Sequence, residues 1–107
     1  LAQNFKFFGA PVGLLMYLDR QMGSPQWSDA GMFLQTLMLL AREEGLHTCA
    51  QEAWAMWYPE VSAHVGAPEN EMLFCGMALG YKDEDAPINQ LRAERAAVDD
   101  FTTFQGF

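Results

Sequence analysis

The sequence predicts a single domain, or part of one, that mixes buried strands with helices. Two continuous apolar runs, 12–18 and 71–81, have the length and composition of strands with buried side chains. Between them, the apolar residues of 29–44 cover almost the whole circumference of a helix. Hydrophobic residues make up 50% of the 107 residues, which is enough for a core of modest size.

Turn-forming residues separate these elements. The breaker Gly9-Ala10-Pro11 precedes the first strand, which we expect to be buried on both faces. Ser28 is expected to cap the long helix, and Gly45 to end it. Pro59 suits the first turn of a short helix that ends at Gly66.

The packing of these elements follows from their composition. Gly76 and Gly80 in the second strand permit another segment to approach its backbone closely. A helix that is apolar all round is buried either in a large core or between subunits. In a chain of 107 residues we expect the second arrangement, and therefore a dimer.

The charge balance excludes several classes of partner. Acidic residues number 14 against 6 basic ones, and the net charge of −8 argues against nucleic-acid and anionic-membrane binding. No apolar run reaches the roughly 18 to 20 residues that span a bilayer. Cys49 and Cys75 are too few for a disulfide scaffold, so we expect two reduced, buried thiols in a cytoplasmic protein.

The start of the chain carries a further expectation. Its first residue is Leu1 rather than Met, no basic-then-apolar signal peptide opens it, and an apolar strand begins within ten residues. We expect that an upstream segment has been removed or is not represented.

Phosphate-loop and metal chemistry are not indicated. The sequence contains no Gly-x-Gly-x-x-Gly and no Gly-Lys-Ser/Thr phosphate loop. His47, Cys49, His64 and Cys75 are scattered without the spacing of metal ligands, so no metal is predicted.

Nucleophilic catalysis is not indicated either. Ser28, His64 and Asp99 could form a triad only on paper, because no Gly-x-Ser-x-Gly elbow surrounds the serine. Cys49 follows His47 by two residues and could be a nucleophile beside its base, or half of a structural pair, which is the favoured interpretation.

Three further segments have the chemistry of a ligand site. The polar, small-residued elbow from Gly45 to Trp54 can present backbone N–H groups to a flat polar ligand. Trp54, Trp57 and Tyr58 suit either stacking on a flat ring or covering a core or interface. Arg92 and Arg95 could form a fork for a phosphate, or belong to a solvated helix face with an internal ion pair.

The order of several motifs is that of a known family. The motifs are FFGAPV at 7–12, GMFLQ at 31–35, GLHTC at 45–49, AQEAWA at 50–55, CGMALGY at 75–81, APIN at 86–89 and the segment from Arg92 to Arg95. On these motifs the sequence resembles the C-terminal half of the FMN-dependent nitroreductase family, over nearly the whole chain.

The resemblance implies an α+β fold, with an antiparallel-rich sheet flanked by helices. It also implies an obligate homodimer with a long interface helix, which agrees with the apolar segment 29–44. Residues 1–107 would then be a single partial domain, and the tail 98–107 would extend onto a partner subunit.

The same resemblance implies a cofactor site between the subunits. Backbone N–H groups of Ala50, Gln51, Glu52 and Ala53 would face the N5 and O4 edge of FMN, where donors stabilise negative charge as the ring is reduced. Arg92 and Arg95 fall where the family places basic side chains near the FMN phosphate. Trp54 and Trp57 are candidates for the acceptor pocket, and no catalytic side chain is required.

The implied reaction is ping-pong hydride transfer, in which NAD(P)H reduces the flavin and an electron-poor nitroaromatic or quinone then accepts the electrons. The sequence departs from the family at Ala50, where many relatives carry Pro, at Ala53, where Gly is common, and in lacking the Arg-rich N-terminal segment. Two alternatives stay open. One is a non-catalytic remnant that dimerises through its long helix, and the other is a different flavin reaction, such as reductive dehalogenation or cleavage of the flavin itself.

Overall fold

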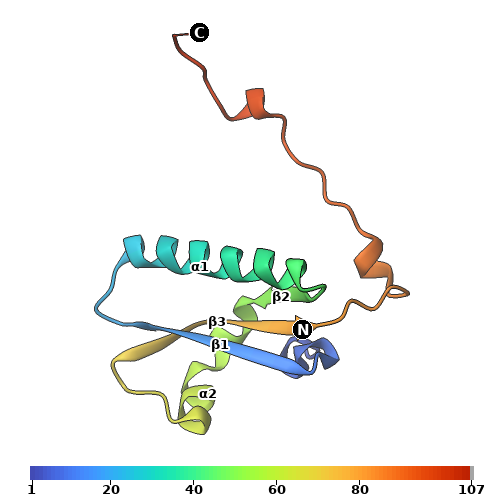
Figure 1. Ribbon diagram of the computed structural model, residues 1–107. Helices are drawn as coiled ribbons and strands as arrows, with labels where there is room; N and C mark the ends of the chain where they lie inside the picture. The colour runs from blue at the N-terminus through green and yellow to red at the C-terminus, as the bar shows by residue number, and fades with distance from the viewer. Residues whose placement is uncertain (107) are drawn as a thin grey trace.

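A three-stranded antiparallel sheet forms the centre of the computed structural model, which describes residues 1–106 (Figure 1). The strands are β1 (Val12–Asp19), β2 (His47–Gln51) and β3 (Glu71–Gly80), in the order β1-β3-β2. Helix α1 (Ser24–Glu43) covers one face of this sheet, and α2 (Tyr58–Val65) lies on the other side. The predicted α+β mixture of helices with an antiparallel sheet is confirmed.

The central strand is β3, not the first apolar run. It pairs with β1 from Leu79 opposite Val12 and with β2 from Gly80 opposite His47. Within the described residues β1 has a neighbour on one side only, and Val12 is exposed. Val12 and Gly13 are exposed and the rest of β1 is only half-buried, so the expectation that 12–18 is buried on both faces is wrong, because the described residues cover the faces of this strand only in part.

The glycines of β3 do permit close approach, as predicted. A Cβ on Gly76 would fall inside the Trp54 indole, and one on Gly80 would lie 2.7 Å from Cδ of Pro11. These contacts bring the chain around residues 10 and 54 against the middle and end of β3. Only a residue without a side chain leaves room for them.

Helix α1 begins earlier than the sequence indicates. It starts at Ser24 with Gly23 as its N-cap and Pro25 in the first turn, so Ser28 is not the cap. Proline already has the φ of a first helical turn and no N–H to leave unsatisfied, which allows the helix to begin there.

The end of α1 agrees with the sequence prediction. Gly45 has a φ of 75°. Its N–H donates to the Arg42 carbonyl over 3.1 Å, and the N–H of Leu46 donates to the Ala41 carbonyl over 2.8 Å. This pair of bonds is the Schellman arrangement, which satisfies carbonyls of the last turn.

Only one face of α1 is buried within the chain. Ala30, Leu34 and Ala41 are buried, and Leu34 packs on Cys75 and Met77 of β3. The side chains of Met32, Phe33, Leu39 and Leu40 are more than half exposed. The helix is thus apolar all round in composition but is not buried all round by the described residues.

The elbow at 45–54 is more regular than predicted. Residues 47–51 form β2, and Glu52–Trp57 form a 3₁₀ segment, η2. Helix α2 follows and ends at Gly66 with a φ of 71°, as predicted.

Beyond β3 the chain runs away from the sheet (Figure 1). Up to residue 106 it contains only two short 3₁₀ turns, Pro87–Gln90 and Val98–Asp100, so the segment 92–95 does not form the helix face that its charge pattern indicates. Among residues 1–106, no helix is both long enough and apolar enough to cross a membrane.

Candidate functional site

The segment 50–53 lies at the junction of β2 and η2, on an edge of the sheet. Ala50 and Glu52 are exposed, Ala53 is half-buried, and Gln51 is buried. Within the described residues β2 pairs only with β3. Alternate residues of such an edge strand direct their N–H and C=O groups away from the sheet. The junction therefore offers backbone groups and small side chains to a flat polar ligand.

The side chain of Gln51 points into the fold rather than towards such a ligand. It is 2% exposed, and its Nε2 donates to the carbonyl oxygen of Asn4 over 3.0 Å. Asn4 belongs to the N-terminal 3₁₀ segment η1 (Asn4–Gly9). Because a carbonyl can only accept, this bond determines which end of the Gln51 amide faces Asn4. The Oε1 atom is buried without a hydrogen-bond partner among the described residues.

The two tryptophans differ in their surroundings. The Trp54 indole stacks on Phe7 with ring centroids 4.6 Å apart, and its Nε1 is buried without a partner among residues 1–106. Phe5 meets Trp54 edge-on at 5.5 Å and Trp57 edge-on at 6.3 Å. Trp57 remains 49% exposed. Most of Trp54 thus packs within the chain, whereas Trp57 presents a face to solvent.

Asn4 is a further residue of the site that no sequence motif indicates. Its nearest signal is Phe7, which belongs to a family motif and adopts a left-handed backbone with a φ of 48°. Nothing in the pattern of residues 4–9 indicates the two contacts with Gln51 and Trp54.

The arginines do not lie with the other predicted site residues. Arg92 and Arg95 are exposed in the segment that projects from the sheet (Figure 1). The Nη1 atom of Arg92 donates to the Leu91 carbonyl over 3.1 Å, and that of Arg95 to the Glu94 carbonyl over 3.1 Å. In the described part of the chain neither guanidinium pairs with a carboxylate. Both charges are therefore available to an anion.

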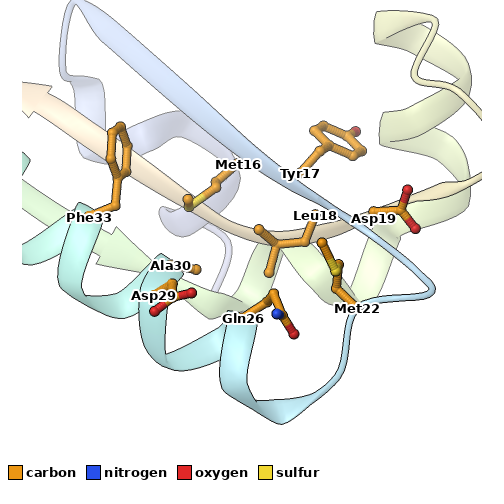
Figure 2. A pocket seen from close by; sticks show the side chains of 9 residues that line it. All are labelled: Met16, Tyr17, Leu18, Asp19, Met22, Gln26, Asp29, Ala30 and Phe33. Atoms are coloured by element: carbon orange, nitrogen blue, oxygen red, sulfur yellow. The ribbon is translucent and has the colours of Figure 1, made fainter.

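Two open hollows flank the sheet. One, of about 400 Å³, includes Trp54 with Phe7, Leu15, Glu60, Val61, His64 and Val65 in its lining. The other, of about 370 Å³, lies between β1 and the first half of α1 (Figure 2). None of the predicted site residues lines the second hollow, and both carboxylate oxygens of its Asp19 accept hydrogen bonds, from Gln21 N and Asn70 Nδ2.

His47 and Cys49 do not form a nucleophile–base pair. The Nε2 of His47 lies 2.6 Å from Nη1 of Arg42, and a guanidinium only donates, so this nitrogen accepts. Desolvation raises the pKa of the Cys49 thiol, which disfavours the thiolate.

The two thiols also differ in exposure. Cys75 is buried in β3, and desolvation together with the charge of Glu52 raises its pKa. Cys49 is exposed, so the prediction of two buried thiols is wrong for it, because β2 lies at the edge of the sheet. In the described range 1–106, no three His, Cys, Asp or Glu side chains are grouped as metal ligands.

Comparison with known proteins finds one family. The family model named Nitroreductase family matches residues 1–81. The chain is 45% identical over 104 residues to a 4-nitrobenzoate reductase of Pseudomonas putida, covering 97% of this chain and 46% of that protein. It is 38% identical over 102 residues to a nitrobenzene nitroreductase of Ectopseudomonas oleovorans, covering 95% and 45%.

Solved structures give the same result. The FMN and NADPH-dependent nitroreductase NfnB from Sphigopyxis sp. strain HMH superposes with a TM-score of 0.94 at 47% identity, over 98% of this chain and 47% of that one. NfnB from Mycobacterium smegmatis, solved in complex with NADPH, gives a TM-score of 0.92 at 30% identity, over 97% and 46%. The chain thus spans about half the length of the relatives that it matches.

Proposed function

The chain belongs to the nitroreductase family, and from this premise we propose that the protein carrying it is an FMN-dependent NAD(P)H oxidoreductase. Its proposed acceptors are nitroaromatic compounds, quinones or similar electron-poor molecules, reduced by ping-pong hydride transfer through the flavin N5. The observation that carries this proposal is the 45% identity to a 4-nitrobenzoate reductase across 97% of the chain.

The residues at the β2–η2 junction fit the edge of a flavin ring. Ala50 and Ala53 carry the smallest side chains that retain a Cβ, so a planar ring can approach the backbone at both positions. Gln51 directs its amide inward to Asn4, so its side chain does not stand between the backbone and a ring at this edge. When bound, FMN supplies the hydride chemistry of the reaction. The N–H groups of 50–53 would stabilise the negative charge that develops at that ring edge.

The surroundings of the two arginines and two tryptophans suit their proposed roles in binding FMN and the acceptor. The guanidinium groups of Arg92 and Arg95 donate to local carbonyls alone among the described residues, and would pair with the FMN phosphate. The half-exposed Trp57 offers an indole face to an aromatic acceptor, and Trp54 would contribute a wall of the same pocket from its position on Phe7.

A homodimer is part of the proposal. The exposed face of α1 gathers four large apolar side chains, Met32, Phe33, Leu39 and Leu40, and a second copy would bury them. The tail from residue 98 projects from the body with Phe101 exposed, and would extend onto that partner (Figure 1). Phe107 of the predicted tail lies outside the described residues. A cytoplasmic location remains a prediction.

The test begins with the purified protein and its colour. We expect flavin absorbance, bleaching by NADPH or NADH without oxygen, and recovery of the absorbance when 4-nitrobenzoate is added. Steady-state rates should give parallel double-reciprocal lines, as a ping-pong reaction requires. A colourless protein that takes up no added FMN would contradict the enzyme and favour a non-catalytic dimerisation remnant. A yellow protein that does not reduce nitroaromatic compounds but dehalogenates aryl halides would indicate a different flavin reaction.

A further inference from the structure

Energetically unfavourable features gather where η1 meets the β2–η2 junction. Phe7 and Phe8 both have left-handed backbones, with φ of 48° and 53°, a conformation that bulky L-residues rarely adopt. They are the only non-glycine residues with positive φ in the described chain. Strained backbone persists only where surrounding contacts enforce it, and such strain concentrates at functional sites.

The same junction contains two unsatisfied buried polar atoms. They are Gln51 Oε1 and Trp54 Nε1, and no other buried side-chain nitrogen or oxygen in residues 1–106 lacks a partner. A buried acceptor or donor without a partner destabilises the fold. An aliphatic residue at position 51 would avoid that cost, so stability alone does not account for a glutamine there.

What the glutamine provides is a tether. Its Nε2 donates to the Asn4 carbonyl over 3.0 Å, and Asn4 Oδ1 lies 3.4 Å from the same nitrogen. Three residues further on, the stack of Trp54 on Phe7 joins η2 to η1 as a second connection. Of the two contacts with η1, the Gln51 hydrogen bond is the polar one, and it is made from a residue of the segment 50–53 itself.

We propose that Gln51 is a positioning residue that fixes the peptide units of 50–53 through its bond to Asn4. This inference rests on the proposed function, in which these peptide units face the flavin. The tether would hold the N–H groups at one distance from the ring edge, so that they stabilise its developing charge without first having to reorganise.

Two substitutions separate this role from a merely structural one. Gln51→Met keeps the length of the side chain and removes the donor. Gln51→Glu keeps the shape, and its carboxyl can donate to the Asn4 carbonyl only when protonated. Gln90→Met is the matched control, because Gln90 Nε2 also donates to a backbone carbonyl, that of Glu84 over 2.8 Å, but at an exposed position.

The first readout is amide hydrogen exchange of the intact protein without FMN. We expect Gln51→Met to accelerate exchange at 50–53 by about tenfold, the effect of losing roughly one buried hydrogen bond, while exchange in the centre of β3 stays unchanged. In Gln51→Glu, exchange relative to the wild type should rise with pH as the buried carboxyl ionises. Uniform acceleration over the whole chain, or unchanged exchange at 50–53, would overturn the proposal.

The second readout is the flavin itself. In the FMN-loaded protein, Gln51→Met should make the midpoint potential more negative and slow reduction by NADPH, whereas Gln90→Met should change neither. A normal potential in Gln51→Met would contradict the positioning role even if its melting temperature falls. A wild-type protein that binds no FMN would contradict the proposed function. The hydrogen-exchange measurement, which needs no FMN, would then show by itself whether Gln51 holds the peptide units of 50–53 in place.

Discussion

The Trp54 indole lies between two segments that are distant in sequence, stacked on Phe7 with ring planes 26° apart and filling the space where Gly76 lacks a side chain. This contact joins η1, η2 and the central strand β3. It places an aromatic core directly behind the segment proposed to face the flavin. The stability of the core and the geometry of the site therefore depend on the same residues.

Enlarging Gly76 should destabilise the fold. A Cβ at this position overlaps the Trp54 indole, so Gly76→Val is expected to lower the free energy of unfolding by about 1–3 kcal/mol, as overpacking does. Urea unfolding followed by tryptophan fluorescence measures the change. Gly31→Ala is the control, because a Cβ on Gly31 meets nothing within 4 Å and should raise helix stability by about 0.5–1 kcal/mol. Equal stability of Gly76→Val and the wild type would mean that Trp54 does not occupy this space.

The charge of Glu52 should affect the titration of Cys75. Desolvation is the larger cause of the raised Cys75 pKa and the Glu52 carboxylate the smaller. A raised pKa leaves less thiolate at a given pH and moves its appearance to higher pH. In a Cys49→Ser background, we expect Glu52→Gln to move the thiolate absorbance of Cys75 to lower pH, but not below that of a free thiol. Glu84→Gln serves as the control, and an identical titration with Glu52→Gln would show that the two side chains do not interact.

Removing one backbone donor should change the flavin potential. Glu52 is the first residue of η2, a position that tolerates proline, and Gln51 before it, with φ of −140° and ψ of 88°, lies outside the helical region that a following proline disfavours. Glu52→Pro therefore removes an N–H with little distortion and should shift the FMN reduction potential. Glu52→Ala removes the side chain but retains the N–H, so it reports the effect of the carboxylate alone. If the potential and turnover of Glu52→Pro match those of Glu52→Ala, the N–H at this position does not face the flavin.

The exposed arginines should contribute to FMN retention. Arg92→Ala and Arg95→Ala are each expected to raise the FMN dissociation constant about fivefold, which corresponds to about 1 kcal/mol for a solvent-exposed charged contact. Equilibrium dialysis measures the constant, and the loss should shrink at high salt. Arg20→Ala is the matched control, since Arg20 lies over the Tyr58 ring at 5.4 Å and bonds the Glu69 carbonyl. If the FMN dissociation constants of both variants equal that of the control, Arg92 and Arg95 do not contact FMN and contribute only to the charge of the surface.

A charge on the exposed face of α1 should prevent dimerisation. Leu39 is 61% exposed within the chain and would be buried between two copies. Leu39→Glu is expected to weaken the dimer by about thirtyfold, the effect of about 2 kcal/mol at a central interface residue. Sedimentation equilibrium gives the constant, and Ala63→Glu, which adds the same charge to an exposed position of α2, should leave it unchanged. A Leu39→Glu protein with the wild-type dissociation constant would place the interface elsewhere.

Local chemistry explains which elements could be predicted. The apolar runs of β1 and β3 and the glycines that end α1 and α2 depend on residues close in sequence, and the structure confirms them. Strand β2 was missed because 47–51 mixes small and polar residues and is a strand only alongside β3. The segment 92–95 carries a helical charge pattern, yet it packs on nothing in the described chain that would stabilise a helix.

The sequence by itself determined the family and the mixed fold, because these are recorded in motifs and in local periodicity, and the flavin contacts of 50–53 stay a prediction. Only the tertiary structure decided that the Gln51 amide faces Asn4, that Trp54 packs on Phe7, and that Cys49 lies in the open. The Gln51–Asn4 bond joins residues 47 positions apart, and no local pattern encodes which distant segment a side chain will meet. Those contacts depend on β3, which pairs with both β1 and β2 and so brings η1, the segment before β1, close to the end of β2.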